Sequence, residues 1–201
     1  RLSLKEMAAV FETEGIDTEI LNIGKLDIKG CQACNYCNKS GRCVIDDIVN
    51  EAAKKFEEAD GLVVGSPVYF ASANATLVAF LTRLFYSTSF DKTMKVGASV
   101  AIARRGGCSS TFDELNKFFT ISGMPVASSQ YWNNIHGGAP GQADMDEEVI
   151  KYIEENHPTE DEFNRWAYGT DGTDGHIPAR RRCVSILFYC NLLIFHIHFL
   201  L

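Results

Sequence analysis

Helical and extended patterns of apolar residues alternate along the first three quarters of the chain. In five segments the apolar residues recur at spacings of three and four, which is typical of amphipathic helices. Between them lie short runs that alternate or are continuously apolar, as strands of a half-buried or fully buried sheet do. The predicted elements, in chain order, are a helix ending at Gly15, a strand over 16–23, a helix after Asp47, a strand over 61–66, a helix over 77–85, a strand over 96–103, a helix from Ser110, a strand over 125–132 and a helix over about 145–155.

Polar residues precede two of these helices at positions suited to capping. Asp46 and Asp47 stand where the N-terminal end of a helix favours negative charge, so capping is the preferred interpretation of this acidic pair. Ser110 with Asp113 is predicted to open and cap a later helix in the same way.

The alternation predicts an α/β protein with a doubly wound parallel sheet between two layers of helices, a three-layer αβα arrangement. Such a sheet binds its ligand beyond the carboxyl ends of the strands. A right-handed crossover fold begins with a strand that leads into the first helix, and we find no such strand before Ser3. In the strand order 2-1-3-4-5 that first strand is central, so we expect the given chain to be incomplete at its N-terminal end.

The chain divides into two regions of different pattern. Residues 1–156 form the predicted ligand-binding domain, whereas residues 157–201 are irregular and become apolar from Cys183. The apolar end follows three arginines and has nearly the length of a membrane span. Asn191, His196 and His198 would be costly at membrane depth, so a membrane anchor is the less favoured interpretation. We do not expect this tail to belong to the fold of the domain.

Composition narrows the class of protein. The 201 residues, of which 46% are hydrophobic, suffice for one core of ordinary size. The formal net charge of -7 argues against a surface that binds nucleic acid or anionic lipid. Four of the seven cysteines lie within thirteen residues, and we find no signal peptide. We therefore expect a reducing, cytoplasmic environment rather than a secreted disulfide framework.

The cysteine spacing is the strongest local signal. Cys31, Cys34, Cys37 and Cys43 bring four soft thiolates within reach of one centre. Compact runs of this kind hold [4Fe-4S] clusters, whereas zinc usually takes two separated pairs with a longer spacer. Reduced thiols that only pack a loop are a serious alternative, because cysteine behaves readily as a small buried hydrophobe. The spacing thus favours a cluster over zinc and leaves a metal-free loop open.

A rigid turn with two aromatic residues follows the strand over 61–66. In an open α/β sheet this is where ligands bind, so the turn can form an aromatic-walled slot for a planar ring. An ordinary strand-to-helix loop with core aromatics is an equally good interpretation. The residues concerned are Ser66, Pro67, Val68, Tyr69 and Phe70.

Two further loops are expected at the same edge. The strand over 96–103 leads into Arg105, Gly106 and Gly107, and the next predicted strand leads from Trp132 to His136. Glycines let the backbone approach a ligand closely, and Arg or His can neutralise a reduced ring system or a phosphate. Each residue alone is more readily structural or solvated, but their common location favours a shared site.

Four motifs occur together in one order: GCQACNYCNKSGRCVIDD, DGLVVGSPVYF, FLTRLF and YWNNIHG. In this the chain resembles the NADPH-dependent FMN reductase and iron-sulfur flavoprotein family, over roughly Leu2 to Gly138. The resemblance implies a flavodoxin-like fold, bound FMN, hydride or electron transfer, and a homodimer or larger homo-oligomer.

The resemblance also implies roles for residues. The segment from Ser66 to Phe70 would contact the flavin, Arg105 to Gly107 would contribute from the next loop, and Trp132 and His136 are weaker candidates. In cluster-bearing members the four-cysteine run holds [4Fe-4S], which implies the same for Cys31, Cys34, Cys37 and Cys43.

The chain departs from the family pattern in three places. It lacks the family's phosphate loop of the Gly-Ser-x-Arg-x-x-Gly-Asn-Thr kind, which holds the FMN phosphate at a helix N-terminus. Thr82 stands where an Asp is usual, and the segment after about Glu155 does not resemble the closing helix. The first departure is expected to weaken FMN binding severely.

The function implied by the resemblance is hydride transfer from NAD(P)H to flavin N5, followed by electron transfer to a small-molecule or protein acceptor. A bound cluster would relay single electrons. Two alternatives stay open: a non-enzymatic electron carrier of the flavodoxin or ferredoxin kind, and an interaction module in which zinc staples the cysteine loop.

Overall fold

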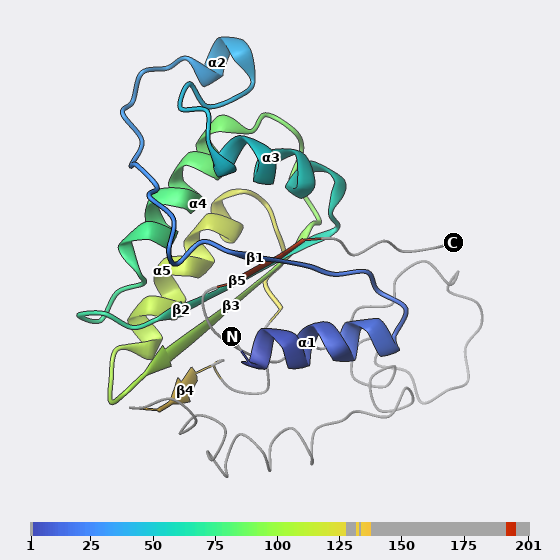
Figure 1. Cartoon of the computed structure of the whole chain (residues 1–201), viewed down its shortest axis with the longest axis vertical. Coiled ribbons are helices and arrows are strands. Elements are labelled where there is room, and N and C mark those ends of the chain that lie inside the picture. The colour runs from blue at the N-terminus through green and yellow to red at the C-terminus, as the bar shows by residue number, and fades with distance from the viewer. Residues whose placement is uncertain (1, 128–131, 133, 138–191, 196–201) are drawn as a thin grey trace.

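A central sheet with helices on both faces forms the described part of the chain, which in this computed structural model comprises residues 2–127, 132, 134–137 and 192–195. The α/β class and the parallel sheet predicted from the sequence are confirmed (Figure 1). The elements are α1 (Leu2–Thr13), β1 (Glu19–Asn22), α2 (Cys37–Ser40), α3 (Ile48–Glu58), β2 (Gly61–Pro67), α4 (Ala75–Ser87), β3 (Val96–Ala103), α5 (Cys108–Ile121), β4 (Asn134–His136) and β5 (Leu192–Phe195).

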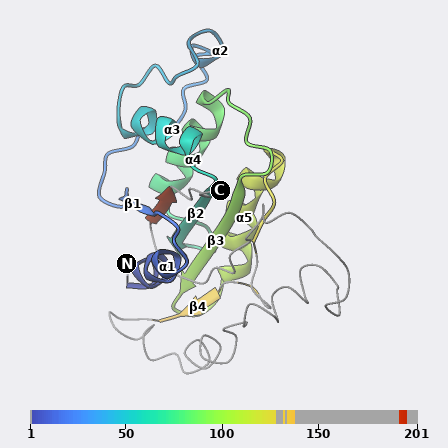
Figure 2. The same ribbon diagram turned by 90° about the vertical axis from the view of Figure 1, so that its right-hand side faces the viewer.

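The sheet has the strand order β1-β5-β2-β3-β4. Its centre is the parallel pair of β2 and β3, which runs in register from Gly61 opposite Val96 to Pro67 opposite Ile102. β4 continues this parallel arrangement beside the end of β3. Figure 2 shows β2 and β3 side by side through the middle of the described residues. The three strands therefore end at the same edge of the sheet, where their loops can meet.

The sequence GLVVGSP makes β2 a strand buried on both faces, as a parallel strand between helices should be. Because successive side chains point to opposite faces, Leu62 and Val64 pack with α3, α4 and α5, whereas Val63 packs with α1. Figure 1 shows the same division, with α1 across the sheet from the other long helices. Phe56, Phe80 and Phe119 fill the core on the face that α3, α4 and α5 cover.

The strands predicted over 61–66 and 96–103 match β2 and β3 closely. Asp47 caps α3 as predicted, because its side chain accepts a hydrogen bond from Val49 N. The predicted cap at Ser110 is wrong: α5 already begins at Cys108, and its N-cap is Gly107 in the left-handed conformation. Ser110 lies within the first turn and uses its hydroxyl elsewhere.

The predicted strand over 125–132 lies only partly within the described residues. Val126 forms a single bridge with Gly97, and the short strand at this edge of the sheet is β4, which begins at Asn134. The short helix α2 inside the cysteine loop was not predicted. The predicted helix over 145–155 lies outside the described residues.

β5 comes from the region predicted to lie apart from the domain fold. Its four residues pair antiparallel with β1 on one side, and two of them, Leu193 and Ile194, pair antiparallel with β2 on the other. In the order 2-1-3-4-5 this central position belongs to the strand that precedes the first helix. The predicted division at 156/157 stays a prediction, because residues 138–191 lie outside the described part of the chain. Within the described residues, no helix is long and apolar enough to cross a bilayer.

Candidate functional site

The loops after β2 and β3 pack directly against each other. Val68 N donates a hydrogen bond to Ile102 O at 2.7 Å, and Ser110 Oγ donates to Ala71 O at 2.7 Å. Gly107 has no room for a side chain, since a Cβ there would lie 2.8 Å from Ala71 Cα. The structure thus brings together two of the three loops that the sequence placed at one edge of the sheet, those after β2 and β3.

The turn after β2 is strained. Tyr69 and Ser72 exchange two backbone hydrogen bonds of 2.9 and 3.1 Å, and the two residues between them, Phe70 and Ala71, have φ values of 53° and 60°. Such tight hairpin turns normally use Asn or Gly, because positive φ costs other residues about 1–2 kcal/mol each. Backbone strain of this kind clusters at ligand sites.

The strained turn displays two aromatic side chains to solvent. Phe70 is fully exposed and Tyr69 is 57% exposed. Large apolar rings are usually buried on folding, so a pair presented on a rigid turn is suited to stacking against a flat ligand. The exposed His136 is the last residue of β4 and pairs with Ala103 at the end of β3, whereas Trp132, which is 52% exposed, precedes β4 by two residues.

Hydrogen bonds from two neighbouring elements hold the turn in place. Glu114 Oε2, on α5, accepts from Ser72 Oγ at 2.7 Å and from Ala73 N at 2.8 Å. Ser66 is fully buried, and its hydroxyl accepts from Asn74 N while it donates to Pro67 O. Glu114 was not predicted: the residues three and four positions away on α5 are mostly polar, so the pattern indicates an ordinary surface carboxylate.

The remaining predicted residues of this edge lie where the strand ends place them. Arg105 and Gly106 are exposed in the loop after β3, and Gly107 has a φ of 94°. Pro67 and Val68 continue β2 into the turn. Their contacts with a cofactor stay predictions.

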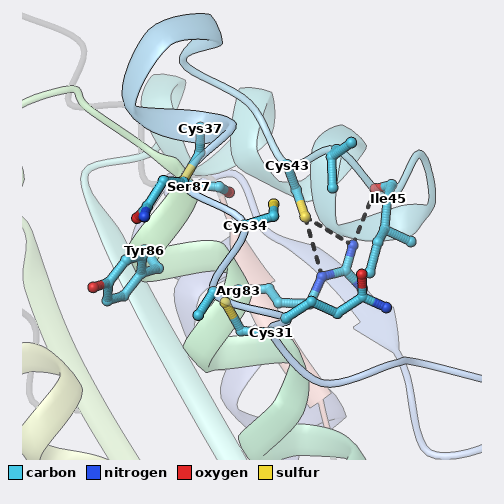
Figure 3. A pocket seen from close by; sticks show the side chains of 12 residues that line it. Cys31, Cys34, Cys37, Cys43, Ile45, Arg83, Tyr86 and Ser87 are labelled. Carbon is cyan, nitrogen blue, oxygen red and sulfur yellow. Dashed lines mark hydrogen bonds between the residues drawn. The ribbon is translucent and has the colours of Figure 1, made fainter.

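The four clustered cysteines line one pocket. Cys31, Cys34, Cys37 and Cys43 surround it from the loop, and Arg83, Tyr86 and Ser87 contribute from α4 (Figure 3). The five cysteines of the described residues, these four and Cys108, are free thiols. Cys108 is buried at the start of α5, where desolvation raises the pKa of its thiol.

The cysteine loop contains two non-glycine residues in the left-handed conformation. Ala33 and Asn35, on either side of Cys34, have φ values of 52° and 56°. Tyr36, which follows, is right-handed at φ −60° and ψ −40°. Neighbouring residues of opposite hand turn successive N–H groups toward one side, an arrangement found at many phosphate and Fe–S sites.

Arg83 ties both ends of the cysteine loop to α4. Its guanidinium donates to Lys29 O before the cysteines, and to Ile45 O and the Asp47 carboxylate after them. Nε and Nη2 each also lie 3.3 Å from Cys43 Sγ (Figure 3). Burial by itself lowers the pKa of Arg83, but the hydrogen bonds and charges of Asp47 and Cys43 outweigh it, so the pKa is raised.

Arg83 interrupts the apolar stripe of α4, which is a signal of a buried charge. Arg83 lies in the stripe that also contains Leu77, Phe80 and Leu84, and it is 1% exposed. A cation on the buried face of a helix requires a charged partner. Asp47, interpreted only as a cap, is that partner as well as the cap.

The pocket fits a metal–sulfur group in its chemistry. It is lined by four thiols, and Ser87 Oγ is buried in its wall without a hydrogen-bond partner among the described residues. As the side chains stand, no three possible ligands within the described residues are close enough together to hold a metal ion. The assignment of Cys31, Cys34, Cys37 and Cys43 as ligands therefore stays a prediction.

A second pocket runs along α4 between the cysteine loop and the strained turn. Gly30 and Cys31 line one part of it, and Ser72, Ala73 and Glu114 line another. Small α4 side chains, together with Thr82, form the wall between them. Cys31 lines both this pocket and the pocket formed by the four cysteines, which we call the thiol pocket. The thiol pocket and the strained turn over Tyr69–Ser72 therefore belong to one continuous region of the surface.

Known proteins share this sequence pattern. Residues 1–138 match the family model described as NADPH-dependent FMN reductase. The chain is 34% identical over 154 residues to an iron-sulfur flavoprotein of Methanocaldococcus jannaschii, in an alignment covering 73% of this chain and 80% of the relative. An iron-sulfur flavoprotein of Methanosarcina thermophila is 29% identical, with 73% and 85% covered, and one of Archaeoglobus fulgidus is 28% identical, with 66% and 71% covered.

Proposed function

Because the chain belongs to the NADPH-dependent FMN reductase family, we propose that it takes electrons from NAD(P)H through bound FMN and passes them to a separate acceptor. The names of its relatives support a flavoprotein oxidoreductase. The nicotinamide donor, the acceptor and the residues that contact the flavin are the finer parts of this proposal.

The observation that carries the proposal is the strained turn over Tyr69–Ser72. Its central residues hold positive φ without glycine, and its two rings face solvent instead of the core. A turn that only connected β2 to α4 would gain nothing from either feature. A flat isoalloxazine ring offers these side chains a stacking partner, which accounts for both.

Bound FMN would supply the redox chemistry, accepting a hydride and releasing electrons. The protein's part is to bind and orient it. Tyr69 and Phe70 would stack on the ring, and Gly107 would let the backbone of the next loop come close. Arg105, with His136 at the end of β4, would compensate negative charge on the reduced ring or on a phosphate of the nucleotide. Trp132, which precedes β4, would be a further contact of the flavin.

We place a [4Fe-4S] cluster in the thiol pocket as part of the same proposal. The iron-sulfur names of three relatives and the compact cysteine spacing support it. Iron and acid-labile sulfide in the anaerobically purified chain are the expected result. Zinc without sulfide would instead support a loop that is held together by zinc. If the chain contains neither iron nor zinc, the four cysteines are metal-free thiols.

Steady-state oxidation of NADPH with a free electron acceptor tests the enzymatic part. We expect turnover that depends on added FMN and falls in a Phe70→Ala variant, because that side chain would stack on the ring. Ile121→Ala is the matched control, since Ile121 is an equally exposed apolar residue at the far end of α5. Flavin reduction without turnover would identify an electron carrier that needs a protein partner.

The physiological acceptor is proposed to be a small molecule or a redox protein. We further propose a homodimer or larger homo-oligomer in the cytoplasm. Sedimentation of the full chain measures the oligomeric state, and a monomer at all concentrations would contradict that part.

A further inference from the structure

Two polar side chains of α4, one helical turn apart, are buried in the wall of the thiol pocket. Arg83 is 1% exposed and Ser87 is 4% exposed, and both line the pocket opposite the cysteine loop (Figure 3). Buried polar groups normally have hydrogen-bond partners. Arg83 has them in full, whereas Ser87 has none among the described residues.

The position of Ser87 at the end of α4 does not explain why its hydroxyl lacks a hydrogen-bond partner. A serine or threonine in a helix can return its hydrogen bond to the carbonyl four residues earlier, and the neighbouring Thr88 does so with Leu84 O at 2.8 Å. Ser87 Oγ makes no such bond in the described structure. A buried donor left in this way is costly unless the pocket receives an acceptor from outside the chain.

Arg83 directs donors at sulfur as well as at carboxylate. Nε and Nη2 both lie 3.3 Å from Cys43 Sγ. A neutral thiol is a weak acceptor, whereas a thiolate, the form that binds metal, accepts charge-assisted hydrogen bonds. The guanidinium is therefore placed where a metal-bound Cys43 would carry negative charge.

We propose that Arg83 and Ser87 are positioning residues that donate hydrogen bonds to the sulfur atoms of an iron–sulfur cluster in this pocket and thereby raise its reduction potential. This role rests on the proposed cluster. One-electron reduction adds a negative charge to the cluster and makes or breaks no bond. Donors directed at its sulfur atoms therefore stabilise the reduced form more than the oxidised form.

Ser87→Ala in the full chain gives the first test. We expect unchanged iron and sulfide content and a more negative midpoint potential. The metal-free chain should keep or raise its melting temperature, because the substitution removes an unpaired buried hydroxyl. Thr111→Val is the matched control: Thr111 Oγ1 is also buried and without a partner in the described structure, but it lies on α5 and outside the thiol pocket.

Opposite shifts at Arg83 and Asp47 give the second test. Arg83→Lys keeps the charge but loses the planar guanidinium, in which both Nε and Nη2 reach Cys43 Sγ. The reduction potential of the cluster should therefore fall. Asp47→Asn keeps a capping oxygen for α3 but removes the charge that neutralises Arg83, so the potential should rise. For Asp47→Asn we expect about a tenfold change in the ratio of reduced to oxidised cluster, or about 59 mV for one electron. Arg42→Gln, next to Cys43 but exposed, is the charge control and should shift little.

A purely structural role would change stability and leave the potential alone. Equal midpoint potentials in the wild type, Ser87→Ala and Arg83→Lys would overturn the proposal. If Arg83→Lys fails to fold, Ser87→Ala and Asp47→Asn decide by the sign of their shifts. A wild-type chain that contains no iron and no sulfide would contradict the cluster itself, and this role would fall with it.

Discussion

Glu114 Oε2 accepts a hydrogen bond of 2.8 Å from the backbone N–H of Ala73. The same oxygen accepts from Ser72 Oγ, so one carboxylate of α5 fixes the end of the strained turn and the start of α4. Phe70 and Ala71 need such support to keep positive φ, because without it the backbone would relax to a less strained conformation. The rigidity of the candidate flavin site thus originates in a helix that does not itself carry the turn.

Removal of the Glu114 carboxylate should destabilise the fold. Glu114→Ala leaves Ala73 N and Ser72 Oγ without their acceptor, and hydrogen bonds to a charged group contribute about 1.5–3 kcal/mol. We expect a loss of that order in the free energy of unfolding, measured with urea. Asp113→Ala, at an exposed position beside it on α5, is the control. Equal stability of the two variants would show that Glu114 does not hold the turn.

The two glycines after β3 should respond very differently to alanine. A Cβ at Gly107 would lie 2.8 Å from Ala71 Cα and 2.9 Å from Val68 Cγ1, at a φ of 94°. Left-handed strain and overpacking together predict a loss of about 2–5 kcal/mol. Gly106→Ala meets nothing within 4 Å and should stay within about 0.5 kcal/mol of the wild type. Urea unfolding of the pair measures this, and similar values would mean that the two loops do not touch.

Glycine at position 71 should stabilise the chain. Ala71 has a φ of 60°, which glycine adopts without a Cβ penalty, so Ala71→Gly should gain about 1 kcal/mol. Ala75→Gly, at the start of α4, should lose about 0.5–1 kcal/mol by the ordinary entropic effect of glycine. A loss at both positions would argue that the turn is not strained.

Cysteine reactivity should separate the loop thiols from Cys108. The thiolate is the reactive form, and burial raises the pKa of Cys108 while leaving it 4% exposed. In the metal-free chain, iodoacetamide should label the exposed Cys31 and Cys34 quickly and Cys108 only on unfolding, as peptide mass spectrometry would show. Fast labelling of Cys108 in the folded chain would contradict its placement.

The same burial predicts a pH dependence of stability. The folded-state pKa of Cys108 lies above its unfolded value, so above about pH 9 the unfolded chain loses this proton first. Stability should therefore fall as the pH rises through this range. Cys108→Ala should reduce that fall, as measured by urea unfolding at several pH values; an identical pH profile in the variant would contradict it.

The elements that position the site could be predicted where burial alone decides structure. β2 and β3 are apolar runs bounded by turn residues, and the capping side chain of Asp47 marks the start of α3. β4 could not be placed in this way, because a three-residue edge strand is decided by pairing with β3 and not by its own pattern. The start of α5 was missed because Gly107 caps it through backbone conformation alone.

The features that give the site its character are tertiary. Phe70 and Ala71 lack the Asn-Gly signature of a tight turn, so their positive φ could not be predicted from local sequence. Arg83 was visible as a cation in an apolar stripe, but its partners Cys43 and Asp47 lie far away in the chain. The aromatic residues and the four cysteines could be proposed from the sequence because residue type and spacing carry their chemistry directly.

Titration of the purified chain with FMN, monitored by the quenching of flavin fluorescence, measures whether Phe70 contacts the flavin. We expect saturable binding that weakens about tenfold in Phe70→Ala, since an aromatic contact contributes about 0.5–1.5 kcal/mol beyond its buried area. Ile121→Ala should bind like the wild type. Equal affinity in wild type and Phe70→Ala would contradict a flavin seated on the turn after β2.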